Sequence, residues 1–505
     1  MWEIEVGAHD RPIGYRFLVE RFKLRALPHF RWSYSSSKRR GINSITFSDE
    51  SLTLFFYPPS YEVGDSALSH LEFALKHEGV NLLIIKKVLE ILSKEDIIDY
   101  IKANQTGKYT RLVWFFYEQL LSEKLPLNDL SKGNYVLILD DKMYYTGTGV
   151  KFPRYKVENN LLGPFDFCPI LRRTIALKNF EEKELDKVAG RVIKEYSPEL
   201  LARAMLYLYT KETLSSWEIE RERPDRGRLV HFTNLLKRAD GSGDCTKKML
   251  VDLQKEIVEP RFALNDYRDF QNYVGGESGF GEPILHYIAP RPENVETLME
   301  GLLAFFAKAS ASDLNPVLVA AIFAFGFVFI HPFEDGNGRI HRFLIHYVLN
   351  RLKFTPKEAV FPVSAAILRN TLEYDKALEI FSVPLLELIT QYSIDEVGQL
   401  SIKEDTCDFY RFIDFTPFAE YLYCKVEETI LTDFETELQF LSDYDRIKKQ
   451  LRDIIDMPDL RLDLFIRFVR QNGGVLSQRK KETYFPMLTD KEIEGMEKII
   501  RGFSN

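Results

Sequence analysis

A run of apolar residues that ends abruptly in a polar loop constrains the fold of this chain more than any other feature. Residues 317–330 are apolar on every face of a helix, and Asn315-Pro316 supplies a capping side chain followed by proline at the first helical position. The run is shorter than the roughly 20 residues that a membrane span needs. We therefore predict a mainly α protein in which this helix crosses the core and aims His331 out of a rigid support.

The loop after this run combines residue types that handle phosphate. Gly336 and Gly338 lack the Cβ atoms that would stop the backbone turning closely against a ligand, and Asn337 tolerates a left-handed conformation. A second helix is expected to begin near Gly338 or Arg339, which directs its positive end at the same place. Arg339 and Arg342 lie three residues apart, so they share a helix face and can hold one polyphosphate.

Two further residues complete a reactive set. Asp335 is a hard oxygen ligand suited to Mg²⁺ that bridges phosphate oxygens. His331, whose ordinary pKa is about 6.5, can accept the proton of an attacking hydroxyl. A purely structural loop has no use for these groups at these spacings, so the stretch predicts a nucleotide or phosphate site. His341 is expected on the helix surface or behind the site, not as a second base.

The loop matches a known signature. The nine matching positions are His331, Pro332, Phe333, Asp335, Gly336, Asn337, Gly338, Arg339 and Arg342. The chain therefore resembles a Fic-domain protein, a family that mostly moves AMP from ATP onto protein hydroxyls. The resemblance implies that His331 is the general base and Asp335 the Mg²⁺ ligand. It also implies that the loop around Gly336, Asn337 and Gly338 binds the α-phosphate, with Arg339 and Arg342 on the β- and γ-phosphates.

On this resemblance the protein is expected to be an enzyme, a protein adenylyltransferase that uses ATP and Mg²⁺ to modify a Tyr, Thr or Ser hydroxyl. The target protein, which can be the chain itself, is not disclosed by the sequence. Alternatives stay open: another Fic-type phosphotransfer, removal of AMP, or a regulator or interaction protein that only senses ATP. Gly338 favours AMP transfer, because relatives that transfer the terminal phosphate differ in this loop.

A second signal lies upstream, where residues 201–217 carry apolar side chains at helical spacing. Many Fic proteins have an autoinhibitory helix with Ser or Thr, three residues, Glu, and then Gly or Asn. Ser216 and Glu220 fit this pattern, and Arg221 does not. The resemblance implies that Glu220 pairs with Arg342 and keeps ATP out of its productive position. The competing interpretation is a solvated charged face formed by Glu218, Glu220, Arg221, Glu222 and Arg223.

A third signal is a short extended run, residues 283–288, flanked by Gly275-Gly276, Gly279 and Gly281. This pattern predicts a hairpin with turn glycines. Fic proteins place a β-hairpin flap here that binds the target segment by strand addition. The resemblance therefore implies Ile284, Leu285 and His286 as target-binding residues.

The chain is expected to divide into three regions. Residues 1–185 form an N-terminal α+β accessory domain, residues 186–400 the Fic catalytic domain with its preceding inhibitory helix, and residues 401–505 a helical domain. The Gly473-Gly474 turn in the last region permits a winged-helix-like module. Beyond the motif helices, the expected helices are 68–92, 110–121, 229–237, 246–257, 295–308, 366–381, 419–440, 460–471 and 490–502, with strands at 135–140 and 143–147.

Composition sets outer bounds on function. The net charge of −8 and the pI near 5.8 argue against a general nucleic-acid binder. The four cysteines lie far apart without metal-ligand spacing, and residues 1–5 show no secretory pattern. We therefore expect a cytoplasmic protein with reduced thiols that does not enter a membrane. A homodimer stays open, as does the trigger that would relieve inhibition.

Overall fold

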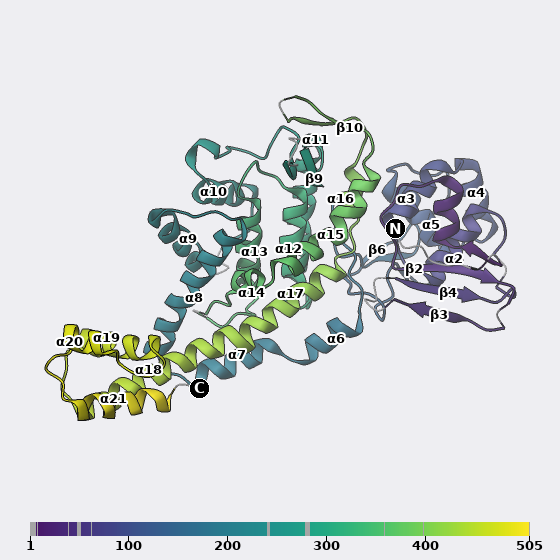
Figure 1. The fold of residues 1–505 in the computed structure, drawn as a ribbon. Helices are drawn as coiled ribbons and strands as arrows, with labels where there is room; N and C mark the ends of the chain where they lie inside the picture. The colour runs from purple at the N-terminus through teal and green to yellow at the C-terminus, as the bar shows by residue number, and fades with distance from the viewer. Residues whose placement is uncertain are drawn as a thin grey trace.

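The computed structural model describes residues 7, 9–38, 40–47, 52–61, 63–239, 243–277, 283–357, 359–396 and 398–503. Within them the protein is mainly helical with small sheets, as predicted. Figure 1 shows a central helical body, an α+β lobe near the N-terminus on the right, and a group of C-terminal helices at the lower left. No helix in these ranges is both long and apolar enough to cross a membrane.

The N-terminal lobe packs helices beside a four-stranded sheet in the order β1-β2-β4-β3. Strands β2 and β4 are parallel, and the outer pairs are antiparallel. The bounds are β1 Asp10–Ile13, α1 Tyr15–Phe22, β2 Arg31–Ser36, β3 Asn43–Thr46, β4 Thr53–Tyr57, α2 Ala67–His77, α3 Leu82–Ile91, α4 Lys94–Ala103 and α5 Lys108–Leu120.

Two predictions for this lobe were wrong. The single helix expected at 68–92 is two helices, because Gly79 has a φ of 102° and the Asn81 side chain caps α3 by accepting from Ile84 N at 3.0 Å. The hairpin expected over 135–147 is absent from these residues, which are all described. Instead β5 (Val136–Leu137) pairs in parallel with β7 (Val157–Asn159), and β6 (Val150–Phe152) pairs antiparallel with β7.

The central body is built around α12, whose side chains are buried on all faces. Helices α11, α13 and α17 pack against it, and Figure 1 shows them gathered in the middle of the molecule. The bounds are α6 Ile175–Glu182, α7 Leu185–Lys194, α8 Pro198–Ile219, α9 Arg226–Arg238, α10 Lys247–Ile257, η1 Pro260–Phe262, β8 Tyr273–Glu277, β9 Pro283–Ile288, α11 Pro292–Ser310, α12 Pro316–Ile330, α13 Asn337–Arg351, α14 Val363–Arg369, α15 Thr371–Leu388, β10 Tyr392–Ile394, β11 Leu400–Ile402, α16 Cys407–Arg411 and α17 Thr416–Glu428.

The helix expected at 366–381 is also interrupted. It divides at Asn370, whose side chain accepts from Glu373 N at 3.3 Å and so caps the start of α15. The predicted helices at 229–237 and 295–308 are present with slightly wider bounds as α9 and α11, and the helix predicted at 246–257 is present as α10, which begins one residue later. One continuous hydrophobic core joins the N-terminal lobe to the central body and ends at Leu438.

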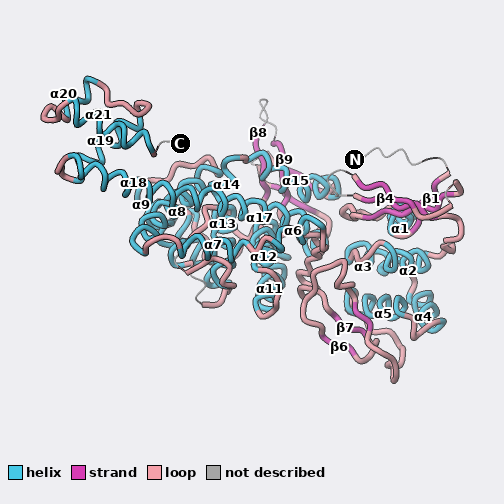
Figure 2. The backbone as a smooth tube through the Cα atoms, turned by 90° about the horizontal axis from the view of Figure 1, so that it is seen from below, coloured by secondary structure: helices cyan, strands magenta, loops and turns pink. Residues whose placement is uncertain are grey.

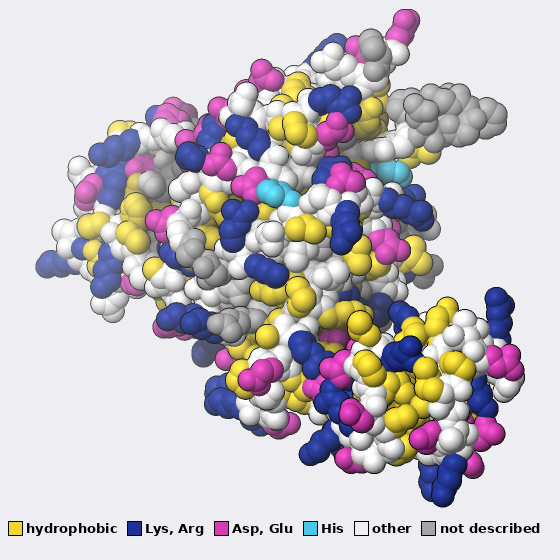
Figure 3. All heavy atoms as spheres, turned by 90° about the vertical axis from the view of Figure 1, so that its left-hand side faces the viewer, with side chains coloured by type: hydrophobic (Ala, Val, Ile, Leu, Met, Phe, Trp, Pro, Cys, Tyr) yellow, Lys and Arg dark blue, Asp and Glu magenta, His cyan; other side chains and the backbone are white. Residues whose placement is uncertain are grey.

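The C-terminal helices have a small core of their own, formed by residues between Ile447 and Ile500. Figure 3 looks from their side of the molecule and shows hydrophobic side chains among charged ones. Residues 403–503 are all described and contain no strand, so the helices there carry no β-wing. The bounds are η2 Thr429–Phe434, a π-helical turn that continues α17, then α18 Glu435–Ile454, α19 Asp459–Gln471, α20 Gln478–Tyr484 and α21 Asp490–Gly502.

Candidate active site

Helix α12 delivers His331 to the surface of the core. At its start Asn315 accepts a hydrogen bond from Val317 N at 3.0 Å, and Pro316 occupies the first turn. At its end His331 adopts φ 53° and ψ 58°, a left-handed conformation that stops the helix. The His331 N–H donates to Phe327 O at 2.9 Å, which closes the last turn.

The half-buried imidazole of His331 is held in one tautomer. Its Nδ1 lies 3.1 Å from Val328 O, and because a carbonyl only accepts, Nδ1 must carry the proton. Nε2 is therefore the nitrogen with a free lone pair. Burial, with a smaller contribution from the nearby Arg268 cation, lowers the pKa of His331 to about 4. At neutral pH the ring is uncharged and able to accept a proton.

The loop after His331 is closed by its own asparagine. Asn337 accepts from Phe333 N at 3.1 Å through Oδ1 and donates to Phe333 O at 2.8 Å through Nδ2. The left-handed position is Gly336, with φ 87°, and Asn337, which would tolerate that conformation, is helical. A Cβ on Gly336 would lie 2.8 Å from Val258 Cγ1, so the position also lacks room for a side chain. Asn337 is the first residue of α13, so only its main-chain N–H remains for a ligand.

Arg339, in the first turn of α13, is buried and surrounded by three partners. Its Nη2 donates to Asp335 Oδ1 at 2.8 Å, and its Nη1 lies 3.3 Å from Glu222 Oε2. Its guanidinium lies over the Trp217 ring at 4.4 Å. The expected phosphate ligand and the expected metal ligand are therefore paired with each other, and Glu222 and Trp217 extend from the end of α8 to hold the arginine.

Arg342 is also buried and is held by the same helix. Its Nε donates to Ser216 Oγ at 2.8 Å, and its Nη2 donates to Ser216 O and Glu220 Oε1, both at 2.7 Å. Desolvation raises the pKa of Glu220, but the Arg342 and Arg339 cations outweigh it, so the pKa lies below its usual value. The structure thus brings the two upstream candidates, Ser216 and Glu220, onto Arg342.

The Glu220 carboxylate also lies against the start of α13. A Cβ built on Gly338 would be 2.1 Å from Glu220 Oε1, so the glycine provides the room that this oxygen fills. The first N–H groups of a helix are unpaired within it and attract an anion. Glu220 is therefore placed where an anionic ligand of α13 would lie.

Arg221 departs from the inhibitory pattern in residue type only. It has a φ of 57°, in the left-handed region where Gly and Asn are favoured. Its N–H donates to Glu218 O at 2.9 Å, and Glu222 N donates to Trp217 O at 3.1 Å. The chain turns here as it would with a glycine, at a conformational cost of about 1 kcal/mol.

Helix α8 is anchored in its middle by buried polar contacts. Glu212 accepts from His346 Nε2 at 2.7 Å and from Ser364 N at 2.8 Å, which ties α8 to α13 and α14. Lys211 donates to Asp433 Oδ1 at 2.6 Å, in the π-helical turn. These contacts hold α8 firmly while its last turn overlies the loop.

The predicted flap is present as two antiparallel strands, β8 and β9, with an irregularity between Val274 and Gly275. In Figure 2 they project from the helical body. Gly275 and Gly276, which were predicted as turn glycines beside the run 283–288, lie inside the partner strand β8, while Gly279 and Gly281 fall outside the described residues. On β9, Ile284 and His286 are exposed and Leu285 is partly buried.

Sequence reasoning misplaced or missed several residues around this loop. Of the two places predicted for His341, the helix surface is wrong, because the residue is fully buried against the Phe325 ring at 4.7 Å. Arg268 and Asn272 were not predicted, although Arg268 Nε donates to His331 O at 2.8 Å and Asn272 Nδ2 donates to Phe333 O at 3.1 Å. Glu222, on Arg339, was assigned only to a charged face. The sequence gives only a weak signal for Arg268, Asn272 and Glu222, because each is a single polar residue in an irregular segment.

Asp335 fits a magnesium ion that a nucleotide brings with it. Its carboxylate is partly exposed and its Oδ1 accepts from Arg339. Mg²⁺ is commonly held by one or two carboxylates together with substrate phosphates. Among the described residues there is no group of three His, Cys, Asp or Glu side chains that could hold a metal by themselves. Asp335 is therefore suited to a shared site and not to a protein cage.

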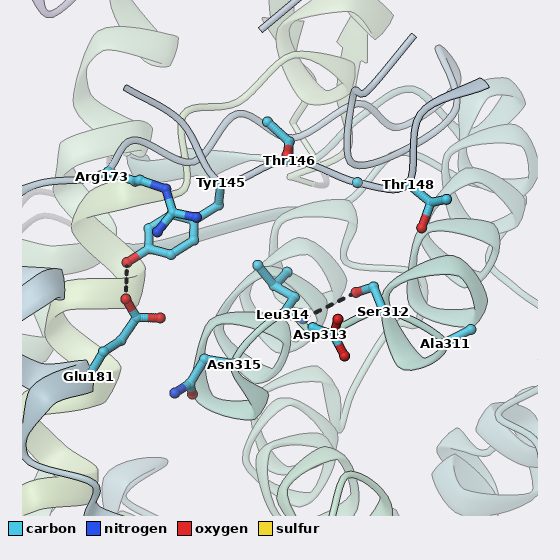
Figure 4. Close-up of a pocket in the computed structure, with 11 residues that line it drawn as sticks. Tyr145, Thr146, Thr148, Arg173, Glu181, Ala311, Ser312, Asp313, Leu314 and Asn315 are labelled. Atoms are coloured by element: carbon cyan, nitrogen blue, oxygen red, sulfur yellow. Dashed lines mark hydrogen bonds between the residues drawn. The ribbon is translucent and has the colours of Figure 1, made fainter. Parts of the chain in front are cut away.

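A separate hollow lies at the other end of α12 and has a volume of about 350 Å³ (Figure 4). It is about 20 Å from His331 along the helix, given the rise of an α-helix. Its polar groups are engaged with each other, since Tyr145 Oη donates to Glu181 at 2.7 Å and Arg173 stacks on the Tyr145 ring at 4.1 Å. We therefore place the candidate active site at the His331 loop.

Comparison with known proteins points to the same loop. The Fic/DOC family matches residues 244–349. The protein adenylyltransferase Fic of Drosophila sechellia is 33% identical over 116 residues, which is 22% of this chain and 21% of that protein. Its counterpart in Drosophila yakuba is 32% identical over the same length. The match thus spans about a fifth of these relatives.

A Fic family protein from Desulfovibrio desulfuricans G20 is similar in structure, with a TM-score of 0.37 and 18% identity. The aligned part covers 66% of this chain and 85% of that protein. The family match rests on residues 244–349.

Proposed function

Because this chain contains a Fic domain at residues 244–349, we propose that it is a protein adenylyltransferase, which transfers AMP from ATP to a Tyr, Thr or Ser hydroxyl of a target protein. One observation carries the proposal. A single carboxylate, that of Glu220, accepts a hydrogen bond from Arg342, lies against the start of α13, and is near enough to Arg339 and His331 for both to lower its pKa. Two cations, a helix N-terminus and a neutral base thus meet at one point, as a nucleotide phosphate and an attacking hydroxyl require.

The proposed reaction assigns one step to each group. His331 Nε2 accepts the proton of the target hydroxyl as its oxygen forms a bond to the α-phosphorus. The bond from that phosphorus to the bridging oxygen breaks, and its electrons leave with pyrophosphate. The main-chain N–H groups at the start of α13 and the guanidinium groups of Arg339 and Arg342 stabilise the phosphate charge. Asp335 would hold Mg²⁺, which neutralises part of the charge on the phosphates.

Autoinhibition by Glu220 belongs to the same proposal. A phosphate and the Glu220 carboxylate require the same cation, Arg342, and the same space beside Gly338. Two anions cannot share that space without strong repulsion. The Glu220 side chain must therefore leave before ATP takes its productive position. Ser216 helps to hold Arg342 in the inhibited arrangement through two hydrogen bonds.

The flap is the proposed place where the target binds. Ile284 and His286 are exposed on β9, and alternate strand positions face the same side of a hairpin. A target segment that adds to this hairpin would receive main-chain hydrogen bonds and contacts with these side chains, with Leu285 on the opposite face.

The test uses ATP that carries a label at either the α- or the γ-phosphate, in the parent protein and in Glu220→Gly. We expect the α label to enter protein, more strongly in Glu220→Gly, and to disappear in Glu220→Gly/His331→Ala. His231→Ala, a change of a surface histidine on α9, serves as the matched control and should keep the signal. Entry of the γ label would indicate a kinase. Entry of neither label in Glu220→Gly would reject the proposal in favour of an ATP-sensing regulator.

A further inference from the structure

Arg268 is a buried cation beneath the His331 loop. Arg268 is 3% exposed and lies in the segment between η1 and β8. In the described part of the chain, all its side-chain hydrogen bonds go to main-chain carbonyl oxygens and none to a carboxylate. A buried charge is costly unless its surroundings compensate it, so this position calls for an explanation.

The guanidinium joins three segments. Its Nε donates to His331 O at 2.8 Å, its Nη1 to Phe270 O at 2.7 Å, and its Nη2 to Pro290 O at 2.6 Å, with Ile330 O at 3.5 Å. The Arg268 main-chain N–H adds a bond to Pro332 O at 2.9 Å. The partners belong to the end of α12, the entry to β8 and the segment that precedes α11. A lysine has only three donors on one atom and cannot reach all of them.

The end of α12 explains how this charge is tolerated. Ile330 and His331 lie at the C-terminus of a helix, where unpaired carbonyl groups and the macrodipole give about half a negative charge. Arg268 satisfies those carbonyl groups and offsets that charge. Burial lowers the pKa of Arg268 to about 10, so it remains a cation at neutral pH.

This arrangement affects the reaction site directly. Without a cation beneath it, the negative end of α12 would face the place where an anionic nucleotide binds. Several groups act on the imidazole: Arg268 lowers the pKa of His331, while Glu220 from α8 and Asp335 from the loop raise it. The Tyr287 ring on β9 lies 6.5 Å from the imidazole. Arg268 also fixes the carbonyl of His331 itself, which restricts where Nε2 can point.

We propose that Arg268 is a positioning residue of the reaction: its hydrogen bonds fix the main chain of His331, and its charge offsets the negative end of α12 beneath the phosphate site. The proposal rests on the proposed function, since it assigns a part in that reaction. It differs from a purely structural role, because it requires that the charge of Arg268 be felt at His331.

Two variants separate the charge from the hydrogen bonds. Arg268→Lys keeps the charge and loses most of the bonds, whereas Arg268→Met loses both. Arg111→Met is the matched control, since Arg111 is likewise buried and donates to Asn134 O at 2.8 Å and Lys156 O at 3.3 Å in the N-terminal lobe. The His331 imidazole is titrated by NMR without nucleotide or metal and is identified by the signal that His331→Ala removes. AMP transfer is measured with all variants in the Glu220→Gly background.

We expect Arg268→Met to raise the His331 titration midpoint and Arg268→Lys to leave it close to that of the parent. Arg268→Lys should lower kcat about tenfold to a hundredfold with little change in KM for the target, the loss typical of a misplaced reactive group. Arg111→Met should change neither quantity. An unchanged midpoint in Arg268→Met, or an unchanged kcat in Arg268→Lys, would overturn the proposal. If Arg268→Met does not fold, the Arg268→Lys measurement decides. The NMR titration does not depend on AMP transfer, so it remains valid if the proposed function fails.

Discussion

The most direct perturbation of the site is Glu220→Gly, which removes a carboxylate that both pairs with a cation and fills a space at the start of α13. Its Oε1 accepts from Arg342 Nη2 at 2.7 Å and fills the space beside Gly338. The substitution is compatible with the backbone, because Glu220 is the C-cap of α8, where glycine is well tolerated. The change should therefore empty the anion position without unfolding the helix that ends there.

The size of the effect follows from the contact. A hydrogen bond between charged groups contributes roughly 1.5 to 3 kcal/mol. The Glu220 side chain is 34% exposed, so solvent screening reduces the value to about 1 to 2 kcal/mol. A free-energy difference of that size corresponds to about a 5- to 30-fold change in an equilibrium. We expect incorporation of α-labelled AMP at subsaturating ATP to rise by that factor.

The assay compares initial rates of label incorporation at several ATP concentrations in parent, Glu220→Gly and Glu218→Gly. Glu218 is an exposed glutamate in the last turn of the same helix and controls for the loss of one charge. The gain should appear in Glu220→Gly alone and should shrink as ATP approaches saturation, because ATP and the carboxylate compete for Arg342. An equal rate in the parent and Glu220→Gly, or an equal gain in Glu218→Gly, would refute the reasoning.

Three further predictions concern the same site. Glu222→Gln as a single substitution should raise the affinity for ATP by less than about fivefold, because the contacts of Glu222 with Arg339 are 3.3 and 3.4 Å long and partly exposed. Isothermal titration with ATP measures this affinity, and an unchanged value would show that Glu222 does not restrain Arg339. Arg221→Gly should relieve the left-handed strain and stabilise the protein by about 1 kcal/mol without releasing inhibition, and a lower Tm would contradict this. In the folded protein the pKa values of His331 and His341 are lowered to about 4. Between about pH 6.5 and pH 4 the unfolded chain therefore binds more protons than the folded protein, so the free energy of unfolding decreases as the pH is lowered through that window. Urea unfolding should show a loss of roughly 2 kcal/mol for each histidine between pH 7 and pH 5, and a flat profile would exclude these values.

The parts of the site that the sequence predicts well are those set by local rules. The spacing of Arg339 and Arg342 on one helix, the cap at Asn315 and the turn at Gly336 all depend on residues within a few positions of each other. Ser216 and Glu220 were found through the family pattern, and the structure places both on Arg342.

The errors arise where side chains, not propensities, decide the backbone. Asparagine tolerates the left-handed region, which left Gly336 and Asn337 both open for the turn, but the Asn337 side chain closes the loop onto Phe333 and the left-handed residue is Gly336. In the same way, Asn370 and Asn81 end helical patterns that are apolar enough to continue, because each side chain caps the helix that follows it.

Long-range contacts outside the family pattern could not be predicted. Arg268 and His331 are 63 positions apart, and Glu222 and Arg339 are 117 apart, so no periodicity or spacing links them. Arg268 is one arginine among many charged residues in a loop-rich segment, and only the fold shows that its donors meet the end of α12.

The two helix ends at the loop make the site electrically asymmetric, and this asymmetry explains why so many buried charges gather there. The end of α12 is negative and the start of α13 is positive, and the loop places them on either side of one anion position. Arg268 offsets the first, and the Glu220 carboxylate offsets both the second and the charge of Arg342. Because the Arg268 contacts are buried main-chain bonds and the Glu220 contact is a partly exposed side-chain bond, the second is the weaker. On the proposed function, we therefore expect an incoming polyphosphate to displace Glu220 and to leave the support of His331 in place.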